Sequence, residues 1–496
     1  MRRHWLQVAG LLAGCLIMTI TQAENTAQID RPSMHFTPPS HWMNDPNGMV
    51  YYQGEYHLFY QHYPDDLVWG PMHWGHAVSK NLIDWQHLPI ALYPDDKGMI
   101  FSGSAVVDSN NTSGLGSQSE PPIVALFTYH DEAAKQSGSK TFQSQGLAYS
   151  LDRGRNWTKY AGNPVLPNPG LIDFRDPKIS WHAPSQRWVM VVTQGDELGF
   201  YSSANLLQWR HESNFGKGFG AHGGVWECPD LINIGDHYVL IVSLVPGGPN
   251  GGSATQYFVG DFDGTTFTPA KQHRDNPSQA LWLDWGPDNY AGVTFAQTEH
   301  QRTLPVFLGW ASNWDYATKV PATTWRSMLT LPRELFMFTV AEQWRLGTRP
   351  VVEVDTAMAE VAFSADQQKL ALPMEGAVKL AFKIHPAKDQ KPFLVMSNDS
   401  NQRVELSLDM DSGEIVLDRR HSGITEFSDD FAIEARVSHV FDSSQNEIDI
   451  YYDGNLIEVF VDGGRSAMTA LVFPSMRFNR LHYQGIEIQH VLTSAL

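Results

Sequence analysis

Apolar and polar residues alternate over short runs through the first two thirds of this 496-residue chain. Such runs predict β-strands, because successive side chains of a strand point to opposite faces. Five of them stand well apart: "EYHLFYQ", "PIVALFTY", "RWVMVVTQ", "HYVLIVSLV" and "LPVFLGWASN". No long amphipathic helical pattern separates them, so the sequence predicts an all-β fold.

A second pattern follows each of the first four runs. It consists of an apolar strand, a small residue, a short polar turn and a closing aromatic residue: "HAVSKNLIDW", "LAYSLDRGRNW", "FYSSANLLQW" and "YFVGDFDGTTF". Five such units, each of about four strands, predict a five-bladed β-propeller over residues 30–350. A plain β-sandwich is the alternative, but it would not need units of such regular design.

The pattern changes after Pro350. Short alternating strands joined by polar turns follow, among them "AVKLAFKIH", "RVELSLDM", "EIDIYYDG" and "LIEVFVDGG". They predict an antiparallel β-sandwich over residues 353–496. Acidic residues of this part are scattered at alternating positions, which usually face solvent, so we assign it no catalysis.

Composition and charge narrow the class of substrate. Aromatic residues make up 12% of the chain, with 16 Trp, and such residues stack on sugar faces, although β-proteins also use them as strand formers. The formal net charge of −19 should repel nucleic acid and anionic lipid. No basic cluster suits a phosphorylated substrate, so a neutral substrate fits best.

The N-terminus has the pattern of a secretory signal peptide, residues 1–23. Arg2 and Arg3 precede a mostly apolar stretch, and "TQA" suits cleavage after Ala23. The stretch is too short for a membrane span, so we expect export to the periplasm or the extracellular space.

A lipid anchor is the alternative interpretation of this segment. "LAGC", ending at Cys15, resembles a lipoprotein box, but five more apolar residues follow Cys15 and favour cleavage after Ala23. Cys228 would then be the single cysteine of the mature chain, which excludes an intrachain disulfide.

Acidic residues recur at matching places in the repeat, just ahead of the first strand of a unit. They are Asp45 of "NDPNG", Asp176 of "FRDPK", Glu227 of "WECPD" and Asp288 of "DNYAG". The first strand of each propeller blade lines the axis, so we expect these acids to converge at one end of the channel. A turn would explain a single Asp-Pro, but converging like charges cost stability, and their repetition favours a functional role.

Two carboxylates are what cleavage of a glycosidic bond requires. Asp45, held by its turn, is the natural nucleophile, and the longer Glu227 is the natural proton donor. If the two lie about 5–5.5 Å apart, the reaction retains anomeric configuration. Ser102 of "FSGS" has no adjacent histidine, so we interpret it as a sugar contact. No metal-ligand spacing or phosphate loop is present, and we expect neither metal nor cofactor.

Five motifs together resemble glycoside hydrolase family 32, the invertase, inulinase and levanase group. They are "WMNDPNG", "FSGS", "FRDPK", "WECPD" and "SNWDYA…WRSMLTLPREL", in order, within a resemblance that runs from about Arg31 to the C-terminus. The likeness is closest to bacterial levanases and exo-acting fructanases. It implies a retaining enzyme that releases fructose from the non-reducing ends of levan and inulin, and from sucrose.

The resemblance also implies roles for individual residues. Asp45 would attack the anomeric C2 of fructose, Glu227 would be the acid/base, and Asp176 would bind fructosyl hydroxyls and stabilise the transition state. The terminal fructose would be held by Asn44, Gln61, Trp69, Phe101, Ser102, Arg175 and Trp314.

Three alternatives stay open on the sequence. The enzyme could cut within chains or transfer fructose to another sugar. It could be an arabinofuranosidase-type hydrolase of the same design, since fold does not fix function. It could also be a non-catalytic sugar-binding module, against which the presence of all three acids argues.

Overall fold

The computed structural model of the chain describes residues 31–296, 302–363, 368–384, 391–439 and 446–494. The expected signal peptide and Cys15 lie outside these residues. Across the described ranges the strands form seven sheets, and helices are confined to three short pieces: α1 (Glu132–Gln136), α2 (Lys271–Asp275) and α3 (Val352–Thr356).

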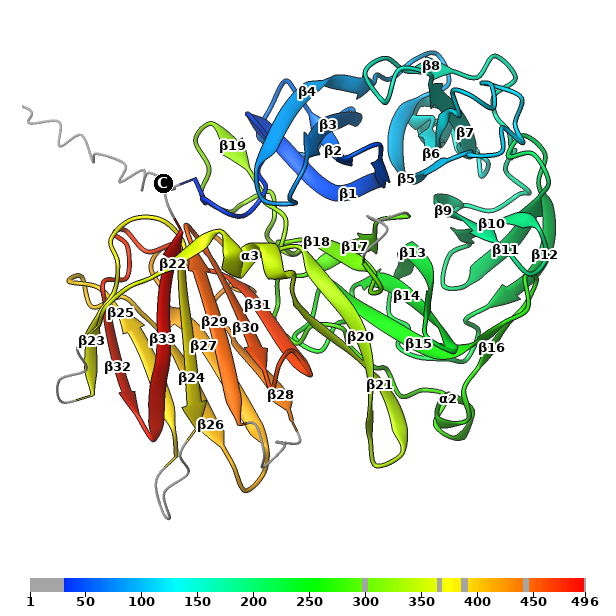
Figure 1. The fold of residues 1–496 in the computed structure, drawn as a ribbon. Coiled ribbons are helices and arrows are strands. Elements are labelled where there is room, and N and C mark those ends of the chain that lie inside the picture. Colours follow the sequence, from blue (N-terminus) through cyan, green and yellow to red (C-terminus); the bar gives the residue numbers. More distant parts are fainter. Residues whose placement is uncertain (1–30, 297–301, 364–367, 385–390, 440–445, 495–496) are drawn as a thin grey trace, which may run out of the picture.

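Five of the described sheets are the blades of a propeller, arranged around an axis (Figure 1). The predicted five-bladed β-propeller is therefore confirmed. From the axis outward, blade one contains β1 (His41–Tyr52), β2 (Glu55–Tyr63), β3 (His73–Ser79) and β4 (Trp85–Leu92), and blade two contains β5 (Met99–Val107), β6 (Ile123–His130), β7 (Gln143–Ser150) and β8 (Thr158–Lys159). Blade three contains β9 (Arg175–His182), β10 (Arg187–Thr193), β11 (Leu198–Ser203) and β12 (Arg210–Phe215), and blade four contains β13 (Val225–Ile234), β14 (His237–Val245), β15 (Ala254–Phe262) and β16 (Phe267–Pro269). Blade five contains β17 (Tyr290–Thr294), β18 (Val306–Trp310), β20 (Arg333–Val340) and β21 (Gln343–Pro350).

The predicted alternating runs form the second strand of each blade. Strands β2, β6, β10, β14 and β18 are almost wholly buried, because both of their faces are covered by neighbouring blades. The first strands meet around the axis, with contacts between β1 and β5, β5 and β9, β9 and β13, β13 and β17, and β17 and β1. Strand β19 (Trp325–Arg326) pairs in parallel with β1 and so ties the last part of the ring to the first.

The remaining described strands form the predicted β-sandwich, with its two sheets packed face to face (Figure 1). One sheet contains β22 (Met358–Glu360), β33 (Ile486–Ser494), β24 (Val378–Ile384), β29 (Glu447–Asp453), β30 (Leu456–Val461) and β31 (Ser466–Leu471). The other contains β23 (Lys369–Ala371), β32 (Arg480–Gln484), β25 (Phe393–Ser397), β26 (Arg403–Asp409), β27 (Glu414–His421) and β28 (Glu434–Ser438).

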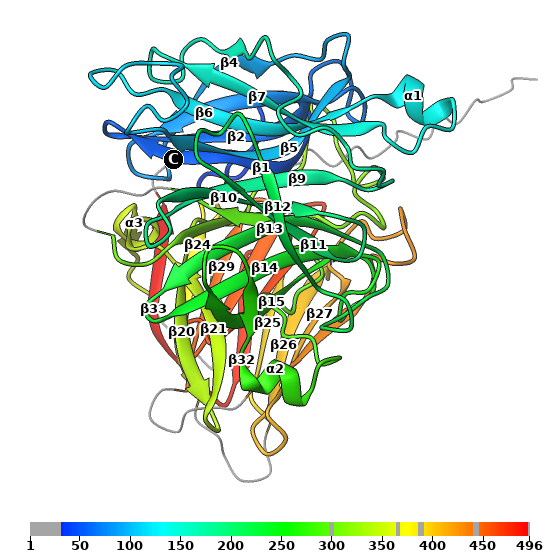
Figure 2. The ribbon, with the colours of Figure 1, turned by 90° about the vertical axis from the view of Figure 1, so that its right-hand side faces the viewer.

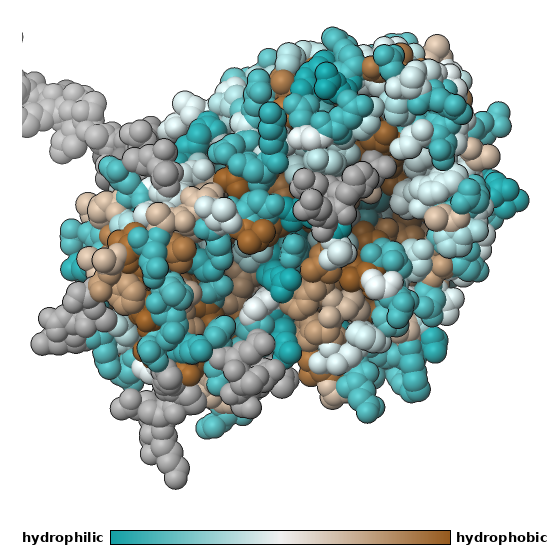
Figure 3. Space-filling view, in the orientation of Figure 1, coloured by the Kyte–Doolittle hydropathy of each residue, from teal (hydrophilic) through white to brown (hydrophobic). Residues whose placement is uncertain are grey.

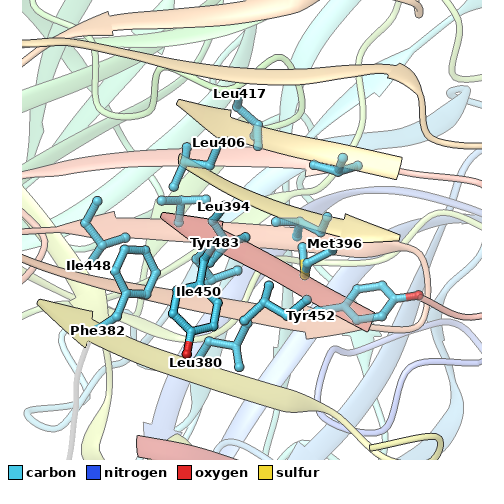
Figure 4. Packing of buried hydrophobic residues seen from close by; sticks show 14 of the residues in the cluster. Leu380, Phe382, Leu394, Met396, Leu406, Leu417, Ile448, Ile450, Tyr452 and Tyr483 are labelled. Carbon is cyan, nitrogen blue, oxygen red and sulfur yellow. The ribbon is translucent and has the colours of Figure 1, made fainter. Parts of the chain in front are cut away.

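The core of the sandwich follows from the alternation of apolar and polar residues along its strands. Figure 4 shows Leu380 and Phe382 of β24 pointing between the sheets with Leu394 and Met396 of β25 and Leu406 of β26. Their exposed fractions are 1% each. Burying side chains of this size contributes about 1.5–3 kcal/mol apiece, and this core can stabilise a sandwich without a disulfide.

The surface agrees with the composition. The face of the propeller in Figure 3 is mostly hydrophilic, with apolar residues in scattered patches. No helix in the described ranges is long and apolar enough to cross a membrane.

Candidate active site

The segment "NDPNG", predicted as a turn, lies inside strand β1. The prediction of a turn is wrong: β1 pairs with β2 on both sides of the segment, with register shifts between Met43 and Pro46 and between Asn47 and Val50. Two β-bulges thus absorb the proline and Gly48, whose φ of +53° suits a residue without Cβ. The bulges re-aim Asp45 toward the axis.

The other two acids also lie within first strands at bulges, not ahead of them as the sequence suggested. Asp176 is in β9 and has a φ of +64°. Glu227 is in β13, and the residue after it, Cys228, has a φ of +47°. Register shifts accompany both sites. Bulges are common next to active sites because they turn one side chain out of the regular alternation.

A cavity of about 420 Å³ opens where these strands meet. Ten of the eleven residues that the sequence singled out line it, all except Asp288: Asn44, Asp45, Gln61, Trp69, Phe101, Ser102, Arg175, Asp176, Glu227 and Trp314. The structure therefore brings them together in one place. The cavity is also lined by residues that the sequence did not indicate: His130, Lys135, Phe142, Gln143, Ile172 and Asp173.

Asp45 lies at the floor of the cavity and is held on both carboxylate oxygens. Ser102 Oγ donates to Asp45 Oδ2 over 2.7 Å, and Asn44 Nδ2 donates to Oδ1 over 3.0 Å. Burial raises the pKa of Asp45 to about 6; these hydrogen bonds oppose the rise, and the charge of Glu227 adds to it. Asp45 is thus a carboxylate with an oriented oxygen and little solvation.

Asp176 is buried next to it. Its Oδ2 accepts the backbone N–H of Cys228 over 3.0 Å. Burial raises its pKa to about 7, against the opposing charge of Arg175 and with a further contribution from the charges of Glu227 and Asp45. The carboxyl therefore exchanges protons close to neutral pH.

Glu227 is held between a cation and a phenol. Arg175 donates to its Oε1 from Nε and from Nη2, over 3.1 and 2.9 Å, and the Tyr290 hydroxyl donates to its Oε2. Arg175 also pairs with Asp173. Tyr290 comes from the first strand of the fifth blade, β17, so the glutamate is oriented by the blades on either side of its own.

Aromatic rings form the walls. Trp69 is 38% exposed at the mouth and meets Phe101 edge to face, with ring centroids 6.0 Å apart. His130 stacks on Phe101 at 4.2 Å. On the other side Trp314 packs against the buried Trp42, at 5.9 Å. Flat apolar walls around acidic and amide groups suit a sugar ring.

Asp288, which the repeat predicted to join the other acids, does not reach the cavity. The prediction is wrong because its carboxylate is taken up by the sandwich: it accepts hydrogen bonds from Arg419 and from the backbone N–H of Leu471, and also from Tyr316. Two residues further on, Tyr290 of blade five instead reaches the site through its hydrogen bond to Glu227, from behind the cavity lining.

The residues that the sequence missed fall into two groups. Asp173 is two residues from Arg175 and Tyr290 two from Asp288, so proximity to a motif could have indicated them. Ile172 adjoins Asp173, whereas Lys135 lies in a connection that carries no motif. Lys135 belongs to α1, which projects from one side of the propeller (Figure 2).

Three carboxylates in an aromatic-walled pocket at the axis of a five-bladed propeller define a glycosidase. The sequence matches the model "Glycosyl hydrolases family 32 N-terminal domain" over residues 35–350 and "Glycosyl hydrolases family 32 C terminal" over residues 352–491. The chain belongs to glycoside hydrolase family 32.

Individual relatives of known name support this family assignment. A levanase of Bacillus subtilis is 41% identical over 495 residues, covering 96% of this chain and 71% of the levanase. An extracellular exo-inulinase of Aspergillus awamori is 38% identical over 509 residues, covering 93% and 92%. The solved structure of an Aspergillus awamori exo-inulinase superposes with a TM-score of 0.85 at 34% identity, covering 94% and 99%. That of a Schwanniomyces occidentalis β-fructofuranosidase with fructosyl-erythritol gives 0.81 at 31% identity, covering 95% and 98%.

Proposed function

We propose that this protein is a retaining β-fructosidase that removes terminal fructose from the non-reducing ends of fructans, and from sucrose. The observation that carries the proposal is the convergence of Asp45, Asp176 and Glu227, from the first strands of three different blades, on one cavity. Relatives named levanase, exo-inulinase and β-fructofuranosidase support the same substrate class.

In the first step Asp45 attacks C2 of the bound fructosyl unit. The bond from C2 to the bridging oxygen breaks, and Glu227 gives its proton to that oxygen, which leaves with the rest of the substrate. Ser102 and Asn44 keep the attacking carboxylate in place. A fructosyl group is then esterified to Asp45.

In the second step Glu227, now a carboxylate, takes a proton from water. The water oxygen attacks C2 from the side that the leaving group vacated, and the ester to Asp45 breaks. Arg175 and Tyr290 stabilise the glutamate while it carries negative charge. Two inversions at C2 leave the configuration of the released fructose unchanged.

Asp176 has a separate role in this proposal. It accepts hydrogen bonds from the fructose hydroxyls, and its charge stabilises the positive charge that develops at C2 in the transition state. Asn44, Gln61, Arg175 and the rings of Trp69, Phe101 and Trp314 would grip the same sugar.

Timed product analysis tests the function. The protein is incubated with levan, inulin and sucrose, and the products are separated during the first few percent of turnover. We expect fructose as the sole early product from both polymers. Oligosaccharides at early times would mean internal cleavage, longer products from sucrose would mean transfer, and activity on arabinan alone would overturn the proposal.

We also propose that the enzyme is exported. Residues 2–23 have the charge and hydropathy of a signal peptide, and the Aspergillus awamori relative is named extracellular. The N-terminal residue of the mature protein tests this, and we expect Glu24. A lipidated Cys15 at that end would mean a membrane anchor instead.

A further inference from the structure

One buried arginine of the sandwich bonds to two segments of the propeller. Arg419 of β27 is 1% exposed. Its Nη1 donates to Asp288, its Nη2 donates to the Tyr316 hydroxyl over 2.8 Å, and that hydroxyl donates to Asp288 Oδ1 over 2.5 Å. The three side chains close a triangle in which the arginine and the hydroxyl both donate to one carboxylate. We call it the interface triad.

The first segment leads from the triad to the acid/base. Its backbone runs along β31 of the sandwich: Asp288 N donates to Thr469 O over 3.1 Å, and Leu471 N donates to Asp288 Oδ2 over 2.8 Å. Two residues later the hydroxyl of Tyr290 donates to Glu227. The chain between Asp288 and Tyr290 is too short to let one move without the other.

The second segment leads from the triad to the aromatic wall. Trp314 lies two residues before Tyr316. Its backbone N–H donates to Ser253 Oγ over 3.0 Å, and the side chain of the preceding Asn313 donates to Pro287 O over 2.9 Å, so the two segments also touch. The position of the Trp314 ring therefore depends on the same cluster.

We infer that Arg419 is a positioning residue of the active site, acting through Tyr316 and Asp288 on Trp314 and Tyr290. The sandwich then does more than stabilise the propeller, since it sets one wall of the pocket and one hydrogen bond to the acid/base. The inference rests on the proposed function, because Trp314 and Tyr290 matter for catalysis only if the cavity binds fructose and Glu227 is the acid/base.

The geometry of the interface triad fixes the positions of its three side chains. A buried carboxylate with three donors and a guanidinium with fixed partners allow one arrangement, whereas a water-exposed pair would allow many. Arg419 also stacks over the ring of Phe431, with its Cζ 3.9 Å from the centroid, which restricts its position further. Loosening the interface triad would shift Trp314 and Tyr290, and small misplacements of residues that position a substrate or a catalytic group reduce turnover strongly.

Tyr316→Phe is the sharpest test, since it removes only the hydroxyl. The ring keeps its contacts with Phe431, at 5.2 Å. We expect kcat/KM for sucrose to fall about 10-fold. Loss of the Trp314 wall alone should appear in KM, while loss of order at Tyr290 should appear in kcat.

Tyr451→Phe is the matched control. Tyr451 is also a buried tyrosine near the junction of the domains, and its hydroxyl donates to Asp355 of α3 over 2.7 Å, but neither residue lines the cavity. We expect a similar loss of thermal stability with kcat/KM unchanged. An equal fall of kcat/KM in both variants would overturn the inference, because it would show a general effect of the interface.

A double-mutant cycle separates positioning from mere stability. If the triad acts through the wall, Tyr316→Phe should lower kcat/KM clearly less in a Trp314→Ala background than in the wild type. If the effect of Tyr316→Phe on kcat/KM is fully additive with that of Trp314→Ala and with that of Tyr290→Phe, the inference is refuted. Arg419→Lys, which keeps the charge but loses the fork, is tested in the same way if Tyr316→Phe does not fold.

The two proposals fail in different ways. If the wild-type protein releases no fructose, the proposed function is wrong. If the wild type is active and Tyr316→Phe is equally active, the function stands and the positioning role is wrong.

Discussion

The carboxylates of Asp45 and Asp176 share one thiol: Cys228 Sγ lies 3.7 Å from Asp45 Oδ2 and 3.8 Å from Asp176 Oδ2. Two acids this close, in a buried site, repel each other when both are ionised. Burial and the neighbouring charges raise the pKa of both carboxyls above the usual value of 3.8. A folded-state pKa above the unfolded one means that the group stabilises the fold below about pH 4 and costs stability as the pH rises through its folded pKa.

Asp45→Asn should therefore make the protein inactive and more stable at once. Asparagine has nearly the same shape but cannot ionise. With a pKa of about 6 against 3.8, the gain in free energy of unfolding at pH 8 is at most about 3 kcal/mol. Thermal unfolding measures it, and the advantage over the wild type should shrink as the pH falls toward 4.

Asp284→Asn provides the contrast. Asp284 is 3% exposed, but Arg333 holds its pKa below the usual value although burial alone would raise it. Its substitution should destabilise the protein at pH 8. If Asp45→Asn also lowers stability at every pH, then the burial of this charge and its repulsion by Glu227 do not dominate the stability of the site.

The acid side of the pH profile should report the ionisation of Asp176 and Asp45. Both must be ionised in the proposed mechanism, so kcat/KM should fall as the pH drops below about 7, the pKa of Asp176, and more steeply below about 6, the pKa of Asp45. Ser102→Ala removes a hydrogen bond that favours the ionised form of Asp45, and the steeper fall should then begin at a higher pH. Initial rates on sucrose between pH 4 and 8 measure both curves.

Ser104→Ala is the control for this shift. Ser104 lies two residues further along β5 and is buried like Ser102, but its hydroxyl donates to Pro177 O and not to an acid. Its profile should keep the wild-type midpoint. A shift of equal size in both variants would mean that Ser102 does not act through Asp45.

Cys228 should be inert toward thiol reagents while the protein is folded. Burial raises the pKa of its thiol well above the usual value, and the charges of Asp176, Asp45 and Glu227 add to the rise, so the thiolate is rare. In protein spanning residues 24–496, labelling by a disulfide reagent at pH 8 should be at least about 100-fold slower than after unfolding. Cys228→Ser should abolish the label in the unfolded chain. Fast labelling of the folded protein would show that the cavity floor opens.

Repetition made the architecture predictable. The second strand of every blade is covered on both faces, so it must be apolar wherever it occurs, and the closing aromatics mark the outer turns. These requirements are local, and a single sequence displays them. The acids were found for the same reason, since they recur at equivalent positions.

What the sequence could not show depends on partners distant in the chain. "NDPNG" contains every residue that favours a turn, and it becomes a bulged strand because β2 pairs with it on both sides. Asp288 occupies the right place in the repeat, but Arg419, in another domain, takes its carboxylate. His130 reaches the cavity from the end of β6, and Lys135 reaches it from the connection after β6, whose path no local pattern specifies.

His35 should make stability fall at alkaline pH. Its Nδ1 lies 2.8 Å from Asp453 and its Nε2 3.0 Å from Glu458, so both ring nitrogens face carboxylates of the sandwich. Burial alone would lower the pKa of His35, but hydrogen bonds and charge from the two acids overcome this and raise it to about 9, from 6.5. Because the folded pKa is the higher one, the stabilisation is complete below pH 6.5 and is lost as the pH rises through 9.

Urea unfolding at pH 7.5, 8.5 and 9.5 isolates this contribution, since Asp45 and Asp176 are largely ionised throughout that range. We expect the wild type to lose roughly 2 kcal/mol of unfolding free energy between pH 7.5 and 9.5, and His35→Gln to be less stable at pH 7.5 but nearly independent of pH. His211→Gln, at an exposed position of β12, should follow the wild-type curve. If His35→Gln keeps the wild-type slope, another group causes the alkaline loss, and the ring is held neutral between its two acids.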